Sequence, residues 1–497
     1  QMPTFSARLE ECASRVGSKV KLAEQAGISF SQLMRYLNGS SKPTVPRLVA
    51  LADAAAVTPG WLLSGDEIKI KDSSQLVLGR DVFLKVLQSV ENTLHNSQRH
   101  ITPYRKSMFI FALSKAAEDM PDDELSYLLS GPAVNEMLDF LSAYSAMSAG
   151  HLNQRIQNAL ISQLNTLGVP SRAFYTDKLG AFAEKLCILS GMDQMLPMNT
   201  GAEAVETAIK AARRWGYQTK KIPKDKAKII VSSGNFHGRT TTIVGFSSEA
   251  EYKRDFGPFD GGFVETPYGD LDALERIAAD PHVCGYITEP MQGEAGIIMP
   301  AEGWLAEAQA ICKKHNVLFI IDEIQTGLGR TGKDFAFQHE IDKPDGLILG
   351  KALGGGVYPV SAFLASKDVM DVFDAGSHGS TFGGNPIAAA IGLEALSILE
   401  DEQLSLKSKT LGDYLKQSLI DMNSGYVRDV RGAGLWIGMD IDPDKISART
   451  LCEQFKDEGI LCKETHETIV RFAPPLTITK DEINWALGRI RPILQSV

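Results

Sequence analysis

Apolar residues recur at two different spacings along the chain, and the change from one to the other falls near residue 136. Before that point they stand three and four positions apart, which is typical of helices with one buried face. After it, short apolar runs alternate with helical segments. The runs are Lys228–Ser232, Val283–Thr288, Val317–Ile321 and Leu347–Leu349, and the helical segments include 202–217 and 302–315. This alternation predicts an α/β fold with a mainly parallel sheet that helices cover on both faces.

Residues Ser18–Leu37 have the pattern of two short helices joined by a sharp turn. The first helix would bury Val20, Leu22, Ala23 and Ala26, and the second would bury Phe30, Leu33, Met34 and Leu37. Gly27 lies at the turn, where a residue without a Cβ turns the chain at no steric cost. Ser29 is placed to cap the second helix. A further helix is expected at Val45–Val57, and the small core would be closed by Trp61, Leu62 and Leu63.

The outer face of the second helix carries polar side chains suited to DNA. Ser31, Gln32 and Arg35, with the capping Ser29, are of the types that bond base edges and phosphates. The ordered features, followed by Trp-Leu-Leu-x-Gly, resemble the phage-repressor (Xre-like) helix-turn-helix domain, which implies a transcriptional regulator with DNA as partner. A helical domain that only mediates dimerisation is the alternative. Residues 1–65 carry seven Lys and Arg against four acids, which is a modest positive net charge. A second copy of this domain in a dimer would therefore strengthen binding to the DNA phosphates.

Three charged residues follow directly on apolar runs of the predicted sheet. Asp322, Glu289 and Lys351 each stand at the carboxyl end of one run. Ligands of open α/β sheets bind beyond these ends, so the three side chains are expected to share one site. Pyridoxal 5′-phosphate (PLP) explains the set, because a lysine must form the imine and a carboxylate must keep the pyridine nitrogen protonated. Lys351 would also move the substrate proton. A structural ion pair between strand ends is the alternative.

A helix start offers a place for the phosphate of the cofactor. Residues Asn199–Ala204 lead directly into the helical segment 202–217, and free N–H groups at a helix start attract phosphate. Such helix starts are common, and this one indicates a phosphate site only because it occurs together with Asp322 and Lys351. Further hydroxyl donors stand in a glycine-rich segment, at Ser380 and Thr381.

Eight ordered motifs make residues from about 137 to 497 resemble the class III (fold type I) PLP-dependent aminotransferases, and most of all their ornithine-specific members. The motifs begin at Asp139, Leu196, Gly234, Glu289, Asp322, Leu349, Gly379 and Ile469, and read DFLSAY, LPMNTG, GNFHGRT, EPMQGE, DEIQTG, LGKAL, GSTFGGNP and IVRFAPP. The resemblance implies a large PLP-binding domain at 136–390 and a smaller α+β domain at 391–497. Before them we expect a helix-turn-helix domain at 1–66 and a helical linker or dimerisation region at 67–135.

The resemblance also implies which residues bind the cofactor. They are Gly201, Ala202, Phe236, His237, Asp322, Ile324, Gln325, Lys351 and Thr381. Phe236 and Ile324 would lie on the two faces of the ring, and Gln325 would bond the ring hydroxyl. Gly201 and its neighbour would hold the phosphate, which Thr381 would reach from a second subunit. A homodimer or higher homo-oligomer is therefore expected.

The substrate-binding residues that the resemblance implies are Tyr144, Arg239, Glu294 and Arg471. Arg239 would clamp a carboxylate with two guanidinium N–H groups. Glu294 and Arg471 resemble the family's switch pair: paired they admit an ω-amine, and opened they leave Arg471 to bind 2-oxoglutarate or glutamate. The expected small-molecule partners are thus amino acids and oxo acids. The alternative is that both arginines are surface cations.

Two departures from the family bear on function. The family's amino-terminal segment, which supplies a tyrosine beside Arg239, has no match, and residues 150–154 read Gly-His-Leu-Asn-Gln in place of Gly-His-x-His-Pro. Two functions therefore stay open. One is an ω-aminotransferase that also binds DNA, and the other is a transcription factor that senses PLP and an amine with little turnover. A weaker third is another class III reaction, such as that of an aminomutase or racemase.

Composition narrows the remaining classes of protein. The chain is 44% hydrophobic and 23% charged with a net charge of −10, which is typical of a globular protein. No apolar stretch approaches the ~18 residues that a membrane span needs, and no signal pattern is present, so we expect no membrane partner and a cytoplasmic location. The six cysteines and nine histidines form no ligand pattern, so no metal is expected.

Overall fold

The computed structural model describes residues 4–41, 43, 45–57, 62 and 137–495. The chain divides into two units at residue 134. The predicted helical region at 67–135 lies outside the described residues, as do Trp61 and Leu63 of the predicted small core. The second unit is called the body here.

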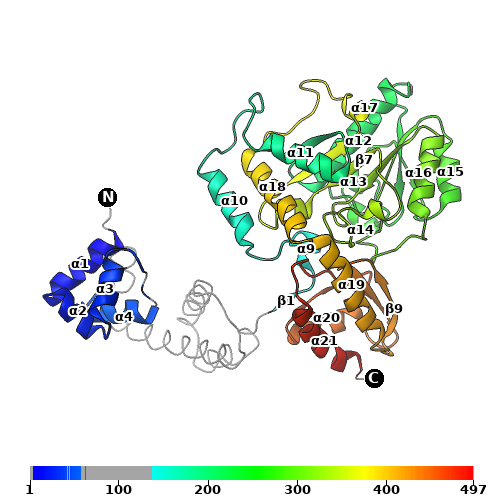
Figure 1. Cartoon of the computed structure of the whole chain (residues 1–497). Coiled ribbons are helices and arrows are strands. Elements are labelled where there is room, and N and C mark those ends of the chain that lie inside the picture. Colours follow the sequence, from blue (N-terminus) through cyan, green and yellow to red (C-terminus); the bar gives the residue numbers. More distant parts are fainter. Residues whose placement is uncertain (1–3, 42, 44, 58–61, 63–136, 496–497) are drawn as a thin grey trace. The chain divides into compact units, whose positions relative to one another are not determined.

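Four helices make up the described part of the amino-terminal unit (Figure 1). They are α1 Phe5–Val16, α2 Lys19–Gln25, α3 Phe30–Leu37 and α4 Val45–Ala54. The side chains of Thr4, Ser18 and Ser29 cap the first three of these helices. Gly27, with a φ of 64°, forms the predicted turn between α2 and α3. The buried core consists of Leu9, Cys12, Ala13, Leu22, Ala23, Ala26, Leu33, Tyr36, Leu48, Leu51, Ala52, Ala55 and Leu62.

Two of the residues predicted to face this core are exposed instead. Val20 is 50% exposed and Phe30 is 47% exposed, whereas Tyr36 is buried at 1%. Leu33 and Tyr36 are one helical turn apart and therefore share the inner face of α3. The hydroxyl of Tyr36 accepts a hydrogen bond from Arg47 Nη1 at 3.3 Å, which satisfies its polar end inside the unit.

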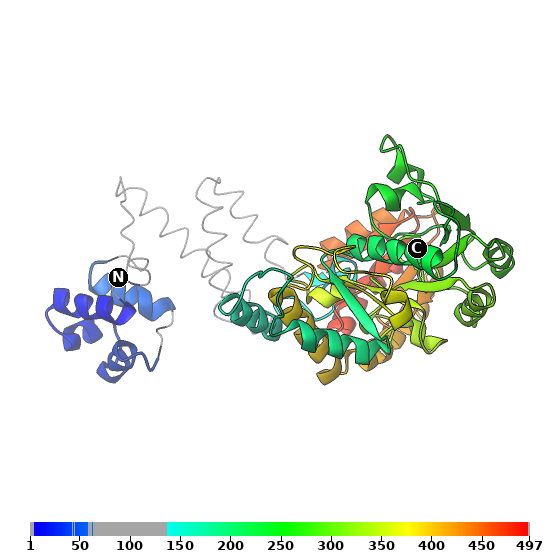
Figure 2. The same ribbon diagram turned by 90° about the horizontal axis from the view of Figure 1, so that it is seen from above.

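A seven-stranded sheet forms the centre of the body (Figure 1; Figure 2). Its order is β2 Gln194–Met198, β8 Ser361–Ala365, β7 Gly346–Leu349, β6 Leu318–Asp322, β5 Val283–Thr288, β3 Lys228–Ser232 and β4 Phe263–Thr266. Neighbouring strands run parallel except at β8, which is antiparallel to both β2 and β7. The predicted mainly parallel sheet is therefore confirmed.

Helices cover both faces of this sheet (Figure 1). One face packs against α12 Gly201–Gln218. The other face packs against α15 Leu271–Ala278, α16 Trp304–Lys314 and α18 Pro386–Asp401. On β6, Ile320 packs in the core on the side of α12, and Ile321 packs in the core on the side of α15, α16 and α18. Because successive residues of a strand point to opposite faces and both faces are buried, these strands read as continuous apolar runs in the sequence.

A four-stranded antiparallel sheet forms a smaller α+β region. Its order is β12 Lys463–Thr465, β13 Ile469–Phe472, β10 Ile437–Ile441 and β9 Val427–Gly432. The helices of this region are α19 Leu404–Ile420, α20 Ala448–Asp457 and α21 Lys480–Leu494. The start of the body is joined to it, because β1 Leu138–Asp139 pairs parallel with β11 Ile460–Leu461. The boundary predicted at residue 390 falls inside α18, and it stays a prediction.

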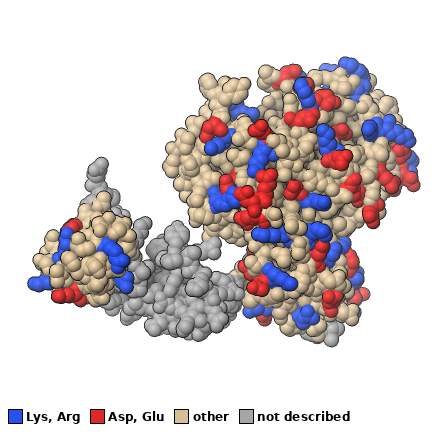
Figure 3. All heavy atoms as spheres, viewed as in Figure 1, with Lys and Arg blue, Asp and Glu red and all other residues tan. Residues whose placement is uncertain are grey.

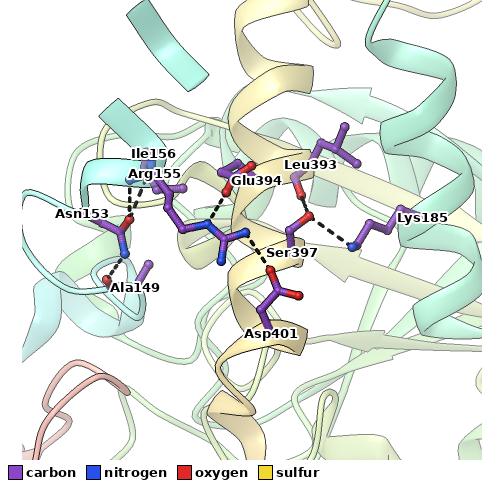
Figure 4. A network of polar contacts seen from close by, with 9 residues as sticks. All are labelled: Ala149, Asn153, Arg155, Ile156, Lys185, Leu393, Glu394, Ser397 and Asp401. Atoms are coloured by element: carbon purple, nitrogen blue, oxygen red, sulfur yellow. Dashed lines mark hydrogen bonds and ion pairs between the residues drawn. The ribbon is translucent and has the colours of Figure 1, made fainter. Parts of the chain in front are cut away.

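Asn153, one of the residues that depart from the family's motif, caps α10 Gln154–Leu164. Its Oδ1 accepts the backbone N–H of Arg155 at 3.0 Å. The Arg155 guanidinium in turn donates to Glu394 at 2.5 Å and to Asp401 at 2.8 Å, both on α18 (Figure 4). The departure therefore retains a helix cap, and the ion pairs of Arg155 hold the first turn of α10 against α18.

Charges of both signs are intermixed on the face of the body drawn in Figure 3. Within the described ranges, no helix is long and apolar enough to cross a membrane. In those same ranges, no three side chains of His, Cys, Asp or Glu form a group that would hold a metal ion. All six cysteines are free thiols.

Candidate active site

Three adjacent strands of the large sheet bring charged side chains to one cavity. Asp322 is the last residue of β6, Glu289 directly follows β5, and Lys351 lies just beyond β7. The cavity has a volume of about 190 Å³ and is lined by Gly201, Ala202, Phe236, His237, Gly238, Glu289, Met291, Asp322, Ile324, Gln325, Thr326 and Lys351. The structure thus brings all the predicted cofactor-binding residues except Thr381 to one place.

Lys351 begins the short helix η3 Lys351–Gly354 with a φ of 44°. A left-handed backbone is uncommon for a residue with a side chain, costs on the order of 1–3 kcal/mol, and persists mainly at functional sites. Burial lowers the pKa of the Lys351 ammonium, although three nearby carboxylates act in the opposite direction. A lowered pKa leaves more of the amine in its neutral, nucleophilic form.

Asp322 is 4% exposed, and each of its carboxylate oxygens accepts a hydrogen bond. His237 Nδ1 donates to Oδ2 at 2.6 Å, and the backbone N–H of Ile324 donates to Oδ1 at 3.0 Å. Burial acts to lower the pKa of His237, but the hydrogen bond to Asp322 and the nearby carboxylate charges outweigh it and raise that pKa. Because each carboxylate oxygen has two lone pairs, Asp322 keeps acceptor capacity toward the cavity.

Glu289 is a second buried carboxylate in the cavity wall. It accepts the backbone N–H of Phe236 at 3.1 Å and that of Gly293 at 3.4 Å. Burial raises the pKa of Glu289 to about 7, and the charge of Asp322 adds to this effect. Its bonds therefore fix the segment that carries Phe236. The strand-end pattern predicts Glu289 for this site, although the resemblance gives it no role in binding the cofactor.

The start of α12 forms another wall of the cavity. Thr200 and Glu203 form a capping box there. The first N–H groups of a helix have no intrahelical partners, so those at Gly201 and Ala202 are available to a ligand. A Cβ at Gly201 would lie 2.8 Å from Ile324 Cδ1, so glycine alone fits without a shift. The positive end of an 18-residue helix therefore faces the cavity, which suits a phosphate.

These features fit PLP, the cofactor that the sequence predicts. The cavity offers an amine, a carboxylate with spare acceptor capacity and a helix start with available N–H groups. The imine, the ring nitrogen and the phosphate of PLP need these three groups. Moreover, His237 Nε2 is buried without a hydrogen-bond partner in the described part of the chain. The roles of the individual residues stay predictions.

Glu294 and Arg471 form an ion pair beside the cavity. Arg471 Nη1 lies 2.9 Å from Glu294 Oε1, which also accepts a hydrogen bond from Gln325 Nε2 at 3.0 Å. Burial acts to raise the pKa of Glu294, but the charge and hydrogen bond of Arg471 outweigh it and lower that pKa. Arg471 is 4% exposed, and its Nε has no partner among the residues described. The guanidinium is thus held through one nitrogen rather than through a bidentate contact.

Tyr144 and Arg239 are placed by aromatic contacts. The guanidinium carbon of Arg471 lies 5.0 Å from the centroid of the Tyr144 ring. That of Arg239 lies 4.1 Å from the Tyr252 ring and 5.7 Å from the Phe236 ring. Arg239 is exposed, and in residues 137–495 it has no ion pair. Stacking on aromatic faces leaves the N–H edges of a guanidinium open to a carboxylate.

Two sets of residues differ from the sequence-based assignment. Thr381 is exposed and does not line the cavity, and its role across a subunit interface stays a prediction. Met291 and Thr326 also line the cavity. They have no predicted role, although both lie inside the quoted motifs. Tyr252, on α14 Ala250–Lys253, was missed because no spacing in the sequence links it to Arg239.

The predicted DNA-contacting residues stand on or at the start of α3. Ser31 and Arg35 are exposed, and Gln32 is half-buried. Arg35 Nη2 donates to Gln32 Oε1 at 2.5 Å, so the two side chains lie together on one face of the helix. The Ser29 hydroxyl accepts the backbone N–H of Gln32 at 3.2 Å and is occupied as the helix cap.

Comparison with known proteins bears on both units of the chain. A family model described as class III aminotransferase matches residues 126–494, and one described as helix-turn-helix matches residues 17–62. An ornithine aminotransferase of Brevibacillus brevis is 53% identical over 363 residues, which is 73% of this chain and 90% of that protein. One of Bacillus subtilis is 52% identical over 374 residues, covering 75% of this chain and 92% of that protein.

Solved structures agree with these matches. The ornithine aminotransferase of Toxoplasma gondii, described with PLP at its active site, has a TM-score of 0.72 and 42% identity, covering 73% of this chain and 87% of that one. An acetylornithine aminotransferase of Elizabethkingia anophelis has a TM-score of 0.66 and 47% identity, covering 72% of this chain and 89% of that one. The chain therefore belongs to the class III aminotransferases, which are PLP-dependent enzymes, and it carries a helix-turn-helix domain at its amino terminus.

Proposed function

We propose that the body transfers the ω-amino group of ornithine, or of a related amino acid, to 2-oxoglutarate, and that the helix-turn-helix binds DNA as a transcriptional regulator. The observation that carries the enzymatic proposal is the Glu294–Arg471 pair beside the cavity that holds Lys351 and Asp322. A permanently unpaired Arg471 would favour substrates with two carboxylates. An Arg471 that Glu294 can neutralise or release lets the site bind a diamino acid in one half-reaction and a dicarboxylate in the other. The relatives' name, ornithine aminotransferase, supports this substrate.

Four residues would hold the cofactor in this proposal. Lys351 would bind it covalently, Asp322 would bond its ring nitrogen, and the N–H groups of Gly201 and Ala202 would bond its phosphate. PLP supplies, when bound, an electron sink for the carbon that loses a proton. Once the substrate amine has displaced it from its bond to the cofactor, Lys351, with its lowered pKa, takes that proton and returns it at the neighbouring carbon position.

The geometry of the switch pair supports opening. Arg471 uses one nitrogen toward Glu294, and its Nε has no partner within the described residues. A substrate carboxylate that bonds two guanidinium nitrogens would be held more strongly than this single contact. Glu294 would then keep its hydrogen bond from Gln325. Arg239, stacked on Tyr252, would bind the other carboxylate of the substrate.

Replacement of Glu294 by alanine is expected to favour the dicarboxylate half-reaction. Without the Glu294 carboxylate, 2-oxoglutarate has no competitor for Arg471, so its KM falls about tenfold. The ratio of kcat/KM for ornithine to that for 2-oxoglutarate falls with it, and separate half-reactions followed by absorbance measure this ratio. Glu294→Gln, which keeps the size and loses the charge, should act in the same direction. An unchanged ratio in both variants would contradict the switch.

A sensor with little turnover is the second candidate function, and one observation favours it. Arg239 is exposed, and the tyrosine that the family's amino-terminal segment places beside it was not found in the sequence. The purified PLP-loaded protein, mixed with L-ornithine and 2-oxoglutarate, separates the two candidates. Glutamate formed over many cycles supports the aminotransferase. A single change in absorbance without product supports the sensor.

A second copy of the chain is the partner we propose for the body. Gly201 and Lys351 also line a second cavity, of about 390 Å³, whose wall includes the exposed Val357. Other large apolar side chains of the body that are exposed include Leu152, Ile161, Leu164, Phe174, Tyr175, Ile188 and Phe382. Contact between two copies would bury such side chains. It would also explain how Thr381, which lies outside its own cavity, reaches a phosphate.

A double variant tests the proposed recognition helix. Gln32→Ala with Arg35→Ala is expected to weaken binding to the DNA upstream of its own gene about 10-fold or more, because each base contact contributes about 1–3 kcal/mol of discrimination. Gel-shift titration measures the loss. The matched control removes the same residue types from α1 and α2, as Arg15→Ala with Gln25→Ala, and should bind as the unaltered chain does. An equal shift in both double variants would reject α3 as the recognition helix.

A further inference from the structure

Arg471, the cation of the switch pair, lies directly opposite a second cation on the neighbouring strand. In the antiparallel pairing of β12 with β13, Lys463 is the register partner of Arg471. Residues that are directly opposite in a sheet project from the same face with their Cβ atoms about 4.5–5.5 Å apart, and like charges there destabilise the pairing. The arrangement therefore needs a compensating negative charge or a function.

Within residues 137–495, Glu294 alone forms an ion pair with either of these two cations. Glu294 lies 2.9 Å from Arg471 and is shared with Gln325. Lys463 has no ion pair in the described range 137–495, and its Nζ donates to the hydroxyl of Tyr144 at 3.4 Å. Lys463, Arg471 and Glu294 thus bring two positive charges and one negative charge together next to the cavity.

Tyr144 connects the two cations. Its ring lies under the guanidinium of Arg471, with 5.0 Å from the guanidinium carbon to the ring centroid, while its hydroxyl contacts Lys463. Its backbone φ of 59° belongs to a run of four left-handed residues, 142–145, each of them strained because none is glycine. Strain of this kind is retained where a side chain must take a particular place.

The strand that carries Lys463 is also fixed to the other member of the switch pair. Thr465 Oγ1, on the same strand, donates to the backbone carbonyl of Glu294 at 2.8 Å. Lys463, Arg471 and the Glu294 backbone therefore keep their places relative to one another. If the Glu294 carboxylate releases Arg471, both cations stay in place and face the incoming group.

We propose that Lys463 is a specificity-determining residue for the dicarboxylate co-substrate. This inference rests on the proposed opening of Glu294 from Arg471. A carboxylate that replaces Glu294 meets the field of two cations, so a dianion such as 2-oxoglutarate binds more tightly than it would to Arg471 alone. The diamino acid brings positive charge and gains nothing from Lys463. The residue therefore separates the two half-reactions by charge.

The first test compares half-reactions in Lys463→Gln. The KM for 2-oxoglutarate is expected to rise about 2- to 5-fold, the range for one exposed charge pair. The ratio of kcat/KM for ornithine to that for 2-oxoglutarate rises by the same factor. Lys463→Arg, which keeps the charge, should restore the original ratio. Lys456→Gln, an exposed lysine of α20, is the control and should leave the ratio as it is.

The second test needs no turnover. Glutarate, a five-carbon dicarboxylate that cannot be transaminated, is titrated calorimetrically into the PLP-loaded protein. Its Kd should rise about 2- to 5-fold in Lys463→Gln, and the difference should shrink in ~0.5 M salt, which screens exposed charges. An unchanged Kd, or no glutarate binding by the unaltered chain, overturns the role of Lys463. Absence of ornithine turnover, with the glutarate difference intact, would instead count against the proposed function alone.

Discussion

Replacement of Lys351 by alanine is expected to abolish transamination and to remove the visible absorbance band of the PLP-loaded protein. The absorbance depends on the covalent bond between the amine and the cofactor, and no other lysine lines the cavity within the described residues. The same amine serves as the proton carrier, and general acid–base catalysis alone contributes about 10²- to 10⁴-fold in rate. Loss of both roles should lower kcat by at least about 10⁴-fold.

Two controls separate this effect from loss of structure. Lys351→Arg keeps a cation in the cavity but offers no nucleophilic amine at neutral pH, so it should be as inactive as the alanine variant. Lys367→Ala removes an exposed lysine that pairs with Asp371, and it should retain the band and the turnover. If Lys351→Ala formed glutamate over many cycles, the assignment of Lys351 would be wrong.

Much of the architecture of the site could be predicted because strand ends are readable in a sequence. Asp322, Glu289 and Lys351 follow continuous apolar runs, and parallel strands place their carboxyl ends at one edge. The structure brings these residues to one cavity, together with Gly201 at the predicted helix start. These features depend on local order along the chain, which the spacing of apolar residues records.

Contacts between distant segments could not be predicted in this way. The stacking of Arg239 on Tyr252 depends on the path of the chain between α13 Thr241–Gly245 and α14, for which apolar spacing gives no rule. The register that sets Lys463 opposite Arg471 depends on how the turn between β12 and β13 closes. Such pairs become visible only when the strands are aligned in space.

The amino-terminal unit illustrates a different difficulty. The sequence correctly predicted α2 and α3, with Ser29 as the cap of α3, but the helical period assigned Phe30 to the core because Phe30 is apolar. Phe30 is the first residue of α3 and is 47% exposed, whereas Tyr36 is buried because Arg47 satisfies its hydroxyl. Hydrophobicity alone does not distinguish a core position from an exposed one at a helix end.

Replacement of Asp322 by asparagine should have the second-largest effect, because it removes one charge with almost no change of size. The carboxylate is 4% exposed and lies in a cavity wall, where electrostatic interactions are stronger than in water. Without the negative charge of Asp322, the ring nitrogen would lose its proton, and the cofactor would lose its capacity to accept electrons. We expect kcat to fall about 10²- to 10³-fold, the usual cost of losing one preorganised electrostatic contact.

The hydrogen bond from His237 provides the matched control for Asp322→Asn. His237→Phe keeps the Asp322 charge but removes the partner at 2.6 Å that orients it, so kcat should fall by a smaller factor of about 10. Steady-state turnover measures both variants, and the absorbance band reports whether the cofactor is still bound. If the asparagine variant kept more than about a tenth of the activity, the loss would be smaller than the loss expected for such a contact. The reaction would then not depend on the charge of Asp322. The negative charge required at the ring nitrogen would then have to come from Glu289, whose pKa of about 7 leaves it only partly ionised at neutral pH.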